Sequence, residues 1–333
     1  MLNSRAVPLL EIQDLTLDFA GDHGSVRALD GVSFSVAEGE TVCLVGESGS
    51  GKTVTAMSIG RLLSSPPALY QKGSLLVDGR DVLRMNKREL RTIRGGVVNY
   101  VFQEPGAALN PVFRVGQQIM ESLKLHQPAH ATDAEVIRLL NLVGIPAPEI
   151  RARSYPHQMS GGMQQRIMIA MAVASRPKLL VADEPTTALD VTIQAQILKL
   201  LRDLQMQLGM AILLITHNLR VVQQIADRVI VMYAGQVVEQ GRADEVIRHP
   251  HHPYTRALLK AVPEIGAGHE RLLAIPGSAP QPGAWPTGCR FHPRCPQRQT
   301  DCHTNSPNLA DTTAGRRARC MYWELTPPVE PHA

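Results

Sequence analysis

Apolar and polar residues alternate along the start of the chain in the way that half-buried β-strands require. Residues 9–19 (LLEIQDLTLDF) and 26–36 (VRALDGVSFSV) carry apolar side chains at about every second position. Successive side chains of a strand point to opposite faces of a sheet, so this period predicts two strands that each bury one face. The short segment between them predicts an antiparallel opening to the fold.

A second kind of strand pattern follows, in which nearly every residue is apolar. It occurs at residues 41–46 (TVCLVG), 97–103 (VVNYVFQ), 178–184 (KLLVADE) and 210–217 (MAILLITH). Such runs are typical of strands in a parallel sheet that is covered on both faces. They predict an α/β core with right-handed crossovers between strands.

Helical periodicity separates these strands. Residues 52–63 (KTVTAMSIGRLL) predict a helix that is stopped by the prolines after it. In residues 191–209 apolar side chains recur every three or four positions, which gives a helix one apolar stripe. Asp190 is placed to cap the start of this helix and Gly209 to end it. The predicted stripe consists of Ile193, Ile197, Leu200, Leu204 and Leu208.

The middle of the chain changes to a purely helical pattern. Residues 116–126 and 132–145 predict two helices, within a helical subdomain that spans about residues 104–175. A helical insert in the middle of the sheet is therefore expected.

The composition changes again near Arg248. One amphipathic helix at most fits residues 249–265, and residues 275–297 are too rich in proline and glycine for a conventional core. We predict an α/β domain over residues 1–248 and a small extension over residues 249–333.

Composition and charge narrow the class of protein. The chain has 333 residues, of which 44% are hydrophobic, so a large core is possible. Its 34 basic and 30 acidic residues are too evenly balanced to indicate binding to nucleic acid. The N-terminal segment lacks the apolar region of a signal peptide, and no apolar run approaches the roughly 20 residues of a membrane helix. A soluble, cytosolic protein is expected.

A phosphate-binding loop is the clearest chemical motif. Residues 46–53 (GESGSGKT) match G-x-x-x-x-G-K-[ST] between a predicted strand and a predicted helix. The glycines let successive backbone N–H groups face phosphate oxygens at the positive end of the helix. Lys52 would neutralise the outer phosphates, and Thr53 would offer its hydroxyl to Mg²⁺. The alternative is a glycine turn without a ligand. The predicted nucleotide-binding residues of this loop are Gly46, Glu47, Ser48, Gly49, Ser50, Gly51, Lys52 and Thr53.

Polar side chains stand at the ends of three other predicted strands. Asp183 ends a buried apolar strand, where a carboxylate is costly unless it is paired or lies near a metal, so it suits a Mg²⁺ site. Glu184 is suited to act as a general base toward water. Gln103 ends another strand, and His217 ends the strand that follows in the chain after Glu184, at the edge where open α/β sheets bind ligands. A helix cap or a solvated loop is the alternative for the carboxylate pair.

A second phosphate-binding turn follows the helical insert. Ser160 is a predicted N-cap, and Gly161 and Gly162 leave the start of its helix open to a ligand. Because the insert separates this turn from Lys52, we expect it to serve the nucleotide of a neighbouring molecule. A capped helix without a ligand is the alternative.

In this order, GESGSGKT, Gln103, SGGM, LLVADE, ALD and His217 resemble the ATPase subunit of an ATP-binding cassette transporter. The resemblance implies a P-loop NTPase core with an antiparallel β subdomain and a helical subdomain, and a dimer that sandwiches ATP. Met163 departs from the usual Gln at the end of the signature. The resemblance implies catalytic roles for Glu184, His217 and Gln103, a magnesium shell of Thr53, Gln103 and Asp183, adenine stacking by Phe19, a signature of Ser160, Gly161, Gly162 and Met163, and a D-loop of Ala188, Leu189 and Asp190.

Several longer segments, among them HHPYTRALLKAVP and GCRFHPRCP, resemble the first ATPase subunit of bacterial dipeptide and oligopeptide importers. This resemblance implies a second, related ATPase as heterodimer partner, two membrane permeases, an extracytoplasmic peptide-binding protein and a place on the cytoplasmic side of the plasma membrane. Nickel and glutathione importers share much of the pattern. Two other classes are a soluble cassette ATPase that acts on DNA or ribosomes and a regulator that binds nucleotide without hydrolysis.

The extension holds four of the five cysteines. Cys43 lies alone in an apolar strand and is expected to pack in the core. The others have the spacing C-x5-C-x6-C-x17-C, which lacks the close pairs of structural zinc sites, and disulfides are disfavoured in a reducing compartment. The resemblance implies a [4Fe–4S] cluster, with zinc or no metal as alternatives. The predicted ligands are Cys289, Cys295, Cys302 and Cys320.

Overall fold

The computed structural model describes residues 7–22, 24–187, 189–261, 275–313 and 315–329. The chain separates into two compact units. Unit 1 comprises Met1–Leu9, Val36–Glu40 and Val77–Leu214, and unit 2 comprises Leu10–Ser35, Thr41–Leu76 and Ile215–Ala333. Sequence neighbours thus fall into different units, and each unit is described by itself.

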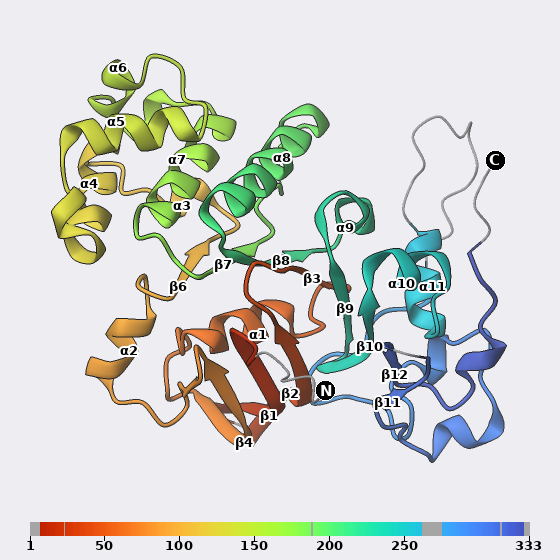
Figure 1. The fold of residues 1–333 in the computed structure, drawn as a ribbon. Coiled ribbons are helices and arrows are strands. Elements are labelled where there is room, and N and C mark those ends of the chain that lie inside the picture. The colour runs from red at the N-terminus through yellow and green to blue at the C-terminus, as the bar shows by residue number, and fades with distance from the viewer. Residues whose placement is uncertain (1–6, 23, 188, 262–274, 314, 330–333) are drawn as a thin grey trace, which may run out of the picture. The chain divides into compact units, whose positions relative to one another are not determined.

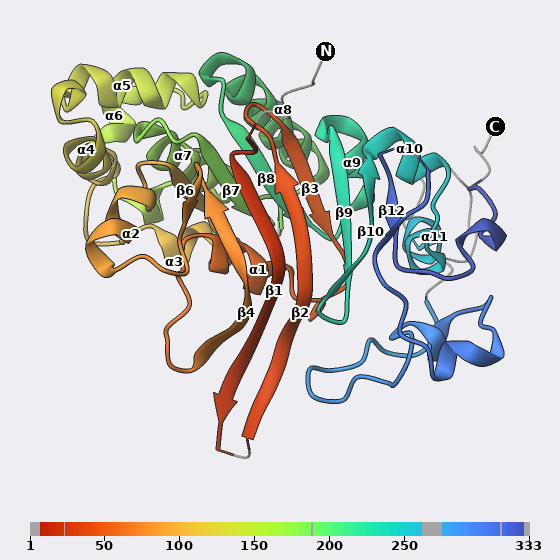
Figure 2. The ribbon, with the colours of Figure 1, turned by 60° about the horizontal axis from the view of Figure 1, so that its bottom comes forward.

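Unit 2 opens with the two strands that the alternation predicted. β1 (Leu10–Gly21) and β2 (Gly24–Val36) form a long hairpin, and β4 (Ala68–Val77) lies on the other side of β1 (Figure 2). The buried positions of β1 change phase at Asp14, from Leu10 and Ile12 to Leu15 and Leu17. Asp14 has a positive φ of 52°, and this local kink lets both halves of the strand bury their apolar side chains.

A second sheet of unit 2 carries the fully buried strand before the phosphate loop. β3 (Thr41–Val45) pairs in parallel with β9 (Arg228–Tyr233), and β9 pairs with antiparallel β10 (Gln236–Arg242). Two short strands of the extension, β11 (Ala310–Asp311) and β12 (Arg317–Ala318), continue this sheet, because β12 pairs with β10 and β11 with β12. The sequence pattern had predicted neither of these strands.

Four α-helices belong to the described part of unit 2. α1 (Lys52–Ile59) ends at Gly60 instead of continuing to Leu63, because a glycine is a poor helix former and comes before the prolines. The predicted amphipathic helix of the extension is α11 (Pro253–Lys260), after the shorter α9 (Leu219–Ile225) and α10 (Ala243–Arg248).

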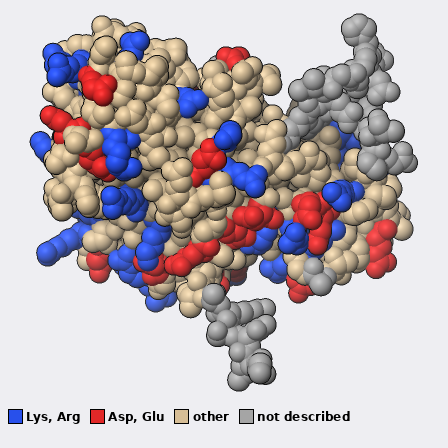
Figure 3. Space-filling view, turned by 45° about the horizontal axis from the view of Figure 1, so that its top comes forward, with Lys and Arg blue, Asp and Glu red and all other residues tan. Residues whose placement is uncertain are grey.

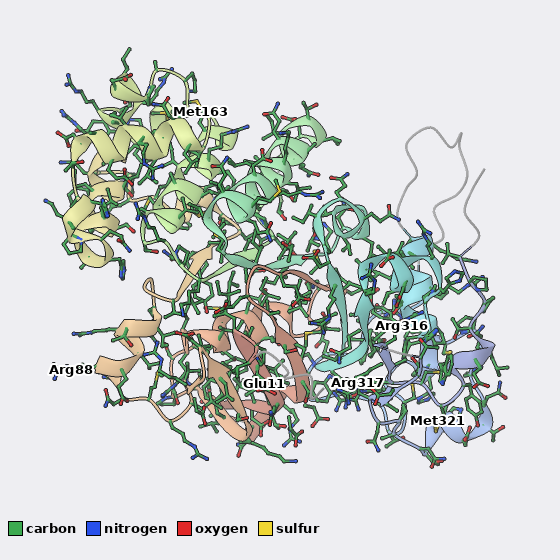
Figure 4. The ribbon with its side chains drawn as sticks, in the orientation of Figure 1. Glu11, Arg88, Met163, Arg316, Arg317 and Met321 are labelled. Atoms are coloured by element: carbon green, nitrogen blue, oxygen red, sulfur yellow. The ribbon has the colours of Figure 1, made fainter. Side chains whose placement is uncertain are left out.

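A buried ion pair ties the extension to β10. Arg316 donates from Nη2 to Oε1 of Glu239 at 3.0 Å, and the two side chains are 6% and 1% exposed. The same carboxylate accepts the backbone N–H groups of His251 and His252. Arg316 and its neighbour Arg317 in β12 are labelled in Figure 4.

Unit 1 contains the predicted helical insert. α4 (Val115–His126) and α5 (Asp133–Leu142) are the two helices that the pattern predicted, and α7 packs against both (Figure 1). The parallel strands β6 and β7 lie beside one another. The remaining elements of this unit are β5 (Arg80–Asp81), α2 (Lys87–Ile93), β6 (Val98–Val101), α3 (Pro105–Ala108), α6 (Pro148–Ala152), α7 (Gly161–Ala174), β7 (Leu179–Asp183), α8 (Val191–Leu208) and most of β8 (Ala211–Thr216).

The long helix α8 begins and ends at its predicted caps, and part of its predicted apolar stripe is buried. The Asp190 side chain accepts the backbone N–H of Ile193 at 2.9 Å, and Gly209 ends the helix with a φ of 65°. Ile197, Leu200 and Leu204 are buried as predicted, together with Leu198 and Leu201. Leu208 is 38% exposed, since it occupies the final position of the helix.

The surface agrees with the balanced composition. On the face drawn in Figure 3, basic and acidic side chains are interspersed. Within the described residues, no helix combines the length and the apolar character that a bilayer span needs.

Candidate functional site

The phosphate loop connects the buried strand β3 to α1. Gly46 has a φ of 154°, and a Cβ at this position would lie 2.2 Å from the carbonyl oxygen of Met232. Gly51 caps α1 with a φ of 102°, and its Cβ would lie 2.8 Å from Cδ2 of Leu29. These two positions require glycine because the backbone conformation and the close approach of neighbours both exclude a side chain.

Lys52 reaches back over this loop. Its Nζ donates to the carbonyl oxygens of Gly46 at 2.8 Å and Glu47 at 2.9 Å, and the residue is 6% exposed. Ser48 and Gly49 are exposed, and so is Thr53 in the first turn of α1. The loop thus presents a helix N-terminus, an ammonium group and a hydroxyl on one side, which is the chemistry that binds a phosphate chain with its metal ion.

Two other predicted residues belong to unit 2. Phe19 is half-buried in β1. His217 is exposed and directly follows β8, as the sequence predicted.

The predicted carboxylates lie in unit 1, where β6 and β7 end side by side. Asp183 is the last residue of β7 and is 9% exposed. Glu184 follows with a positive φ of 47°, a strained conformation for a residue with a side chain. Gln103 donates from Nε2 to Oε2 of Glu184 at 3.4 Å, and Thr187 donates its hydroxyl to the same oxygen at 2.9 Å.

These contacts hold the Glu184 carboxylate in one orientation. The sequence predicts both Gln103 and Glu184 at the C-terminal ends of strands, and the structure shows that these two strands are neighbours and brings the side chains together. It had not identified Thr187, although the residue lies three positions after Glu184 and is within reach of its side chain. The strained backbone of Glu184 is the kind of feature that concentrates at functional sites.

The Ser-Gly-Gly turn starts α7. The Ser160 hydroxyl accepts the backbone N–H of Met163 at 3.4 Å, so Ser160 is the predicted N-cap, and Ser160 and Gly161 are exposed. Met163 is half-buried at the start of the helix (Figure 4).

The D-loop residues lie against this turn. A Cβ on Gly161 would lie 3.8 Å from Cδ2 of Leu189, and one on Gly162 would lie 3.1 Å from Cγ2 of Ile193. Ala188 lies outside the described residues. The turn and the start of α8 therefore form one continuous piece of unit 1.

The four cysteines of the extension line one small cavity of about 20 Å³, together with His252 and Phe291. Burial raises the pKa of Cys295 to about 11 and the pKa of Cys320 to about 12, and it also raises the pKa of Cys289. Among the described residues, no three His, Cys, Asp or Glu side chains are arranged to hold a single metal ion. Cys43 is buried in β3, as the sequence predicted.

A parallel strand that runs into a GESGSGKT loop makes this protein a P-loop nucleoside triphosphatase. Residues 29–187 match the family model "ABC transporter", and residues 238–302 match "Oligopeptide/dipeptide transporter, C-terminal region". The chain is 48% identical over 316 residues to the dipeptide transport ATP-binding protein DppD of Escherichia coli, covering 94% of this chain and 96% of that protein. It is 47% identical over 318 residues to the oligopeptide transport ATP-binding protein AppD of Bacillus subtilis, covering 95% and 97%.

Among solved structures, the chain resembles the post-hydrolysis dimer of the ATP-binding cassette MJ0796 bound to ADP and phosphate. The TM-score is 0.62 at 27% identity, and the match covers 70% of this chain and 98% of that one. The protein belongs to the ATP-binding cassette transporter family and is one of its ATPases.

Proposed function

We propose that the protein is the ATP-hydrolysing motor subunit of an importer for dipeptides or oligopeptides, held at the cytoplasmic face of the plasma membrane by permease subunits. The observation that carries this proposal is the joint presence of a cassette ATPase and the C-terminal region found in oligopeptide and dipeptide transporters. Cassette ATPases that act on DNA or ribosomes would not need that region. Relatives named for dipeptide and oligopeptide transport support the same cargo over nickel or glutathione.

Each predicted residue takes a role within this proposal. Lys52 and the N–H groups of the phosphate loop hold the phosphates of ATP, and the ring of Phe19 stacks on adenine. Thr53, Gln103 and Asp183 are the residues that would hold Mg²⁺. Hydroxyl, amide and carboxylate oxygens suit this hard cation, which neutralises charge on the phosphates when bound.

Water is activated by the strand-end groups. Glu184 accepts the proton of the attacking water, and the hydrogen bonds from Gln103 and Thr187 aim its carboxylate. His217 contacts the outermost phosphate from the end of β8.

The Ser160 turn completes the site of a second subunit. It offers an exposed serine hydroxyl and backbone N–H groups at a helix start, and Leu189 lies close enough to Gly161 to link this turn to the D-loop. We propose a related ATPase as the partner in this sandwich, two permeases beneath it and an extracytoplasmic binding protein that delivers the peptide.

Reconstitution tests the function. The chain, the ATPase and permeases encoded beside it, and the cognate binding protein are placed in liposomes. We expect dipeptides or short oligopeptides to stimulate ATP hydrolysis and a labelled peptide to accumulate across the bilayer. Accumulation of nickel or glutathione without peptide would reject the cargo, and ATP hydrolysis stimulated by DNA or ribosomes would reject the transporter.

The cysteine cavity is the proposed site of a [4Fe–4S] cluster. All four cysteines line this one cavity, and an all-cysteine donor set is the one such clusters use. The raised thiol pKa values mean that assembly releases protons, so a bound cluster would favour the thiolates and stabilise the extension.

We expect anaerobically purified protein to be brown, with broad absorbance near roughly 400 nm and bound iron and sulfide, because cysteine thiolates ligate the cluster. Cys302→Ser should lose the colour. Cys43→Ala is the matched control and should keep it, since Cys43 lies in β3 and does not line the cavity. A colourless protein that carries only zinc would contradict the cluster.

A further inference from the structure

We propose that Arg294 is a positioning residue for the phosphate loop, through which the four-cysteine segment sets the affinity for ATP. The inference deepens the proposed function, on which it rests, by naming a regulation of the same nucleotide site. All the contacts that carry it lie within unit 2.

Arg294 and Glu47 form the contact at the centre of this inference. Arg294 donates from Nη1 to Oε2 of Glu47 at 2.7 Å and from Nη2 to Oε1 at 2.9 Å. The two residues are 247 positions apart in the chain. The Arg294 side chain is 6% exposed and that of Glu47 is 27% exposed. Two parallel charge-assisted bonds fix orientation as well as distance, which a single lysine contact would not do.

Glu47 is the second residue of the phosphate loop, so the ion pair acts on the loop directly. The Glu47 carbonyl oxygen accepts a hydrogen bond from Nζ of Lys52, and the Glu47 N–H donates to the hydroxyl of Tyr254 at 2.8 Å. Its side chain, N–H and carbonyl are therefore all held. A shift of Glu47 would move the carbonyl that orients Lys52, the cation that neutralises phosphate.

Arg294 is itself fixed by its surroundings. Its Nε donates to the Pro276 carbonyl at 2.9 Å, and Nη1 also donates to the Tyr233 hydroxyl at 3.3 Å. Its guanidinium carbon lies 5.8 Å from the centre of the Tyr233 ring. An exposed ion pair contributes little to stability because its side chains move freely. The Arg294 side chain of this pair is buried, and its other hydrogen bonds hold it in place. The ion pair of Arg294 and Glu47 is therefore more than an exposed surface contact.

An aromatic cluster joins the same loop to the cysteine segment. The ring of Tyr233 lies 4.6 Å from that of Tyr254 and 5.3 Å from that of Phe291, between ring centres. Phe291 is 1% exposed. Because it stands between Cys289 and Cys295 in the sequence, the cysteine turn and the Tyr254 hydroxyl that holds Glu47 share one packed core.

The cysteines flank the contacting arginines. Cys295 directly follows Arg294, and its N–H donates to the His292 carbonyl at 3.3 Å. Cys289 directly precedes Arg290, and its N–H donates to the Cys302 carbonyl at 2.9 Å. The conformation of the cysteine turn thus determines where both guanidinium groups point.

Arg290 supplies a second route to the phosphate loop. Its Nη1 donates to the carbonyl oxygen of Ala234, and its Nη2 pairs with Asp30. The next residue, Gly235, donates its N–H to the carbonyl oxygen of Ser50, in the phosphate loop, at 3.0 Å. Both arginines of the GCRFHPRC turn therefore reach this loop, Arg294 directly and Arg290 through one residue.

The test compares ATP affinity in single and double variants. The dissociation constant of a fluorescent methylanthraniloyl-ATP is measured with the full chain, with thermal unfolding in parallel. We expect Arg294→Ala to weaken binding about tenfold, the loss expected when a charged hydrogen-bond partner is removed. Arg298→Ala is the matched control, an exposed arginine three positions after Cys295, and should bind like the wild type. Arg294→Lys should fall between them, because it keeps the charge but not the two-pronged contact.

Coupling is tested with Cys295→Ser. This variant should weaken ATP binding by a similar factor in the wild-type background and add little to Arg294→Ala. The exchanged pair Glu47→Arg with Arg294→Glu should recover part of the affinity that Glu47→Arg loses.

An unchanged dissociation constant in both Arg294 variants would overturn the positioning role. Equal weakening by Cys295→Ser with and without Arg294 would overturn the coupling. Absence of iron in the purified protein would reject the cluster, and uptake of a cargo other than peptide would reject the proposed function. Neither result would change the ATP affinities compared here.

Discussion

Replacing Glu184 with Gln abolishes steady-state ATP turnover while ATP binding stays at the wild-type level. Glutamine keeps the size and the hydrogen-bonding reach of the side chain, but it cannot accept a proton from water. General-base catalysis typically accelerates a reaction by about 10²-fold to 10⁴-fold. The rate of phosphate release should therefore fall by at least about 10²-fold. Phosphate release and the binding of methylanthraniloyl-ATP are measured on the same preparation.

The matched control is Glu104→Gln. Glu104 is exposed and directly follows Gln103, but makes no side-chain cap at the start of α3. The control should hydrolyse ATP at the wild-type rate. Normal turnover in Glu184→Gln would place the base elsewhere, and loss of ATP binding would mean that the charge of the Glu184 carboxylate also contributes to nucleotide binding.

Replacing Gly46 with Ala is the second change with a large expected effect, on binding rather than on chemistry. The added Cβ would lie 2.2 Å from the Met232 carbonyl oxygen and 2.8 Å from the Ser50 hydroxyl oxygen. Because the nearer of these atoms is backbone, β9 or the phosphate loop must move. We expect ATP affinity to fall by more than about tenfold, a loss of over about 1.4 kcal/mol.

Alanine substitutions at two other glycines show how much of the effect comes from backbone strain alone, without displacement of the phosphate loop. Gly49, with φ 76°, and Gly39, with φ 67°, would each place a Cβ where no atom lies within 4 Å. Alanine at either position meets only the strain of a left-handed backbone, about 1–2 kcal/mol. The temperature of thermal unfolding should therefore fall in both variants. ATP affinity should change least in Gly39→Ala. Wild-type ATP affinity in Gly46→Ala would show that the loop does not need its present path.

The sequence pattern could predict those features whose cause is local. The apolar runs before Gly46 and up to Asp183 predict buried strands because nearly every residue is apolar and the runs are too short for a helix. The Asp190 cap and the Gly209 stop are equally local, and both are confirmed. The predicted order of motifs agrees with the family to which the chain belongs. The roles of the individual site residues stay predictions.

A second group of features has a local signal in the sequence that neither alternation nor helical periodicity detects. α2 begins with Asn86 and Glu89, whose side chains bond reciprocally to the backbone of the first turn. This N-x-x-E spacing is the signature of a capping box. Gly60 similarly marked the end of α1 before the prolines.

A third group has no local cause. The Arg294 contact with Glu47 joins residues that periodicity cannot relate, since it depends on how the segment from Cys289 to Cys295 packs on β9 and α11. Two-residue strands such as β12 are equally invisible, because alternation needs more than two positions to be recognised. The nucleotide loop was therefore predictable as a motif, whereas the side chains that steady it were not.

The pairing of β12 with β10 has a consequence for shortened forms of the chain. An uncovered strand presents a row of free N–H and C=O groups that templates pairing with other molecules, whereas a two-residue outermost strand such as β11 offers little to bind. Truncation before Arg316 would also leave the buried Glu239 carboxylate without its cation, which is costly in an apolar interior. We therefore expect a chain that ends before Arg316 to be less stable and to aggregate more readily than the full chain.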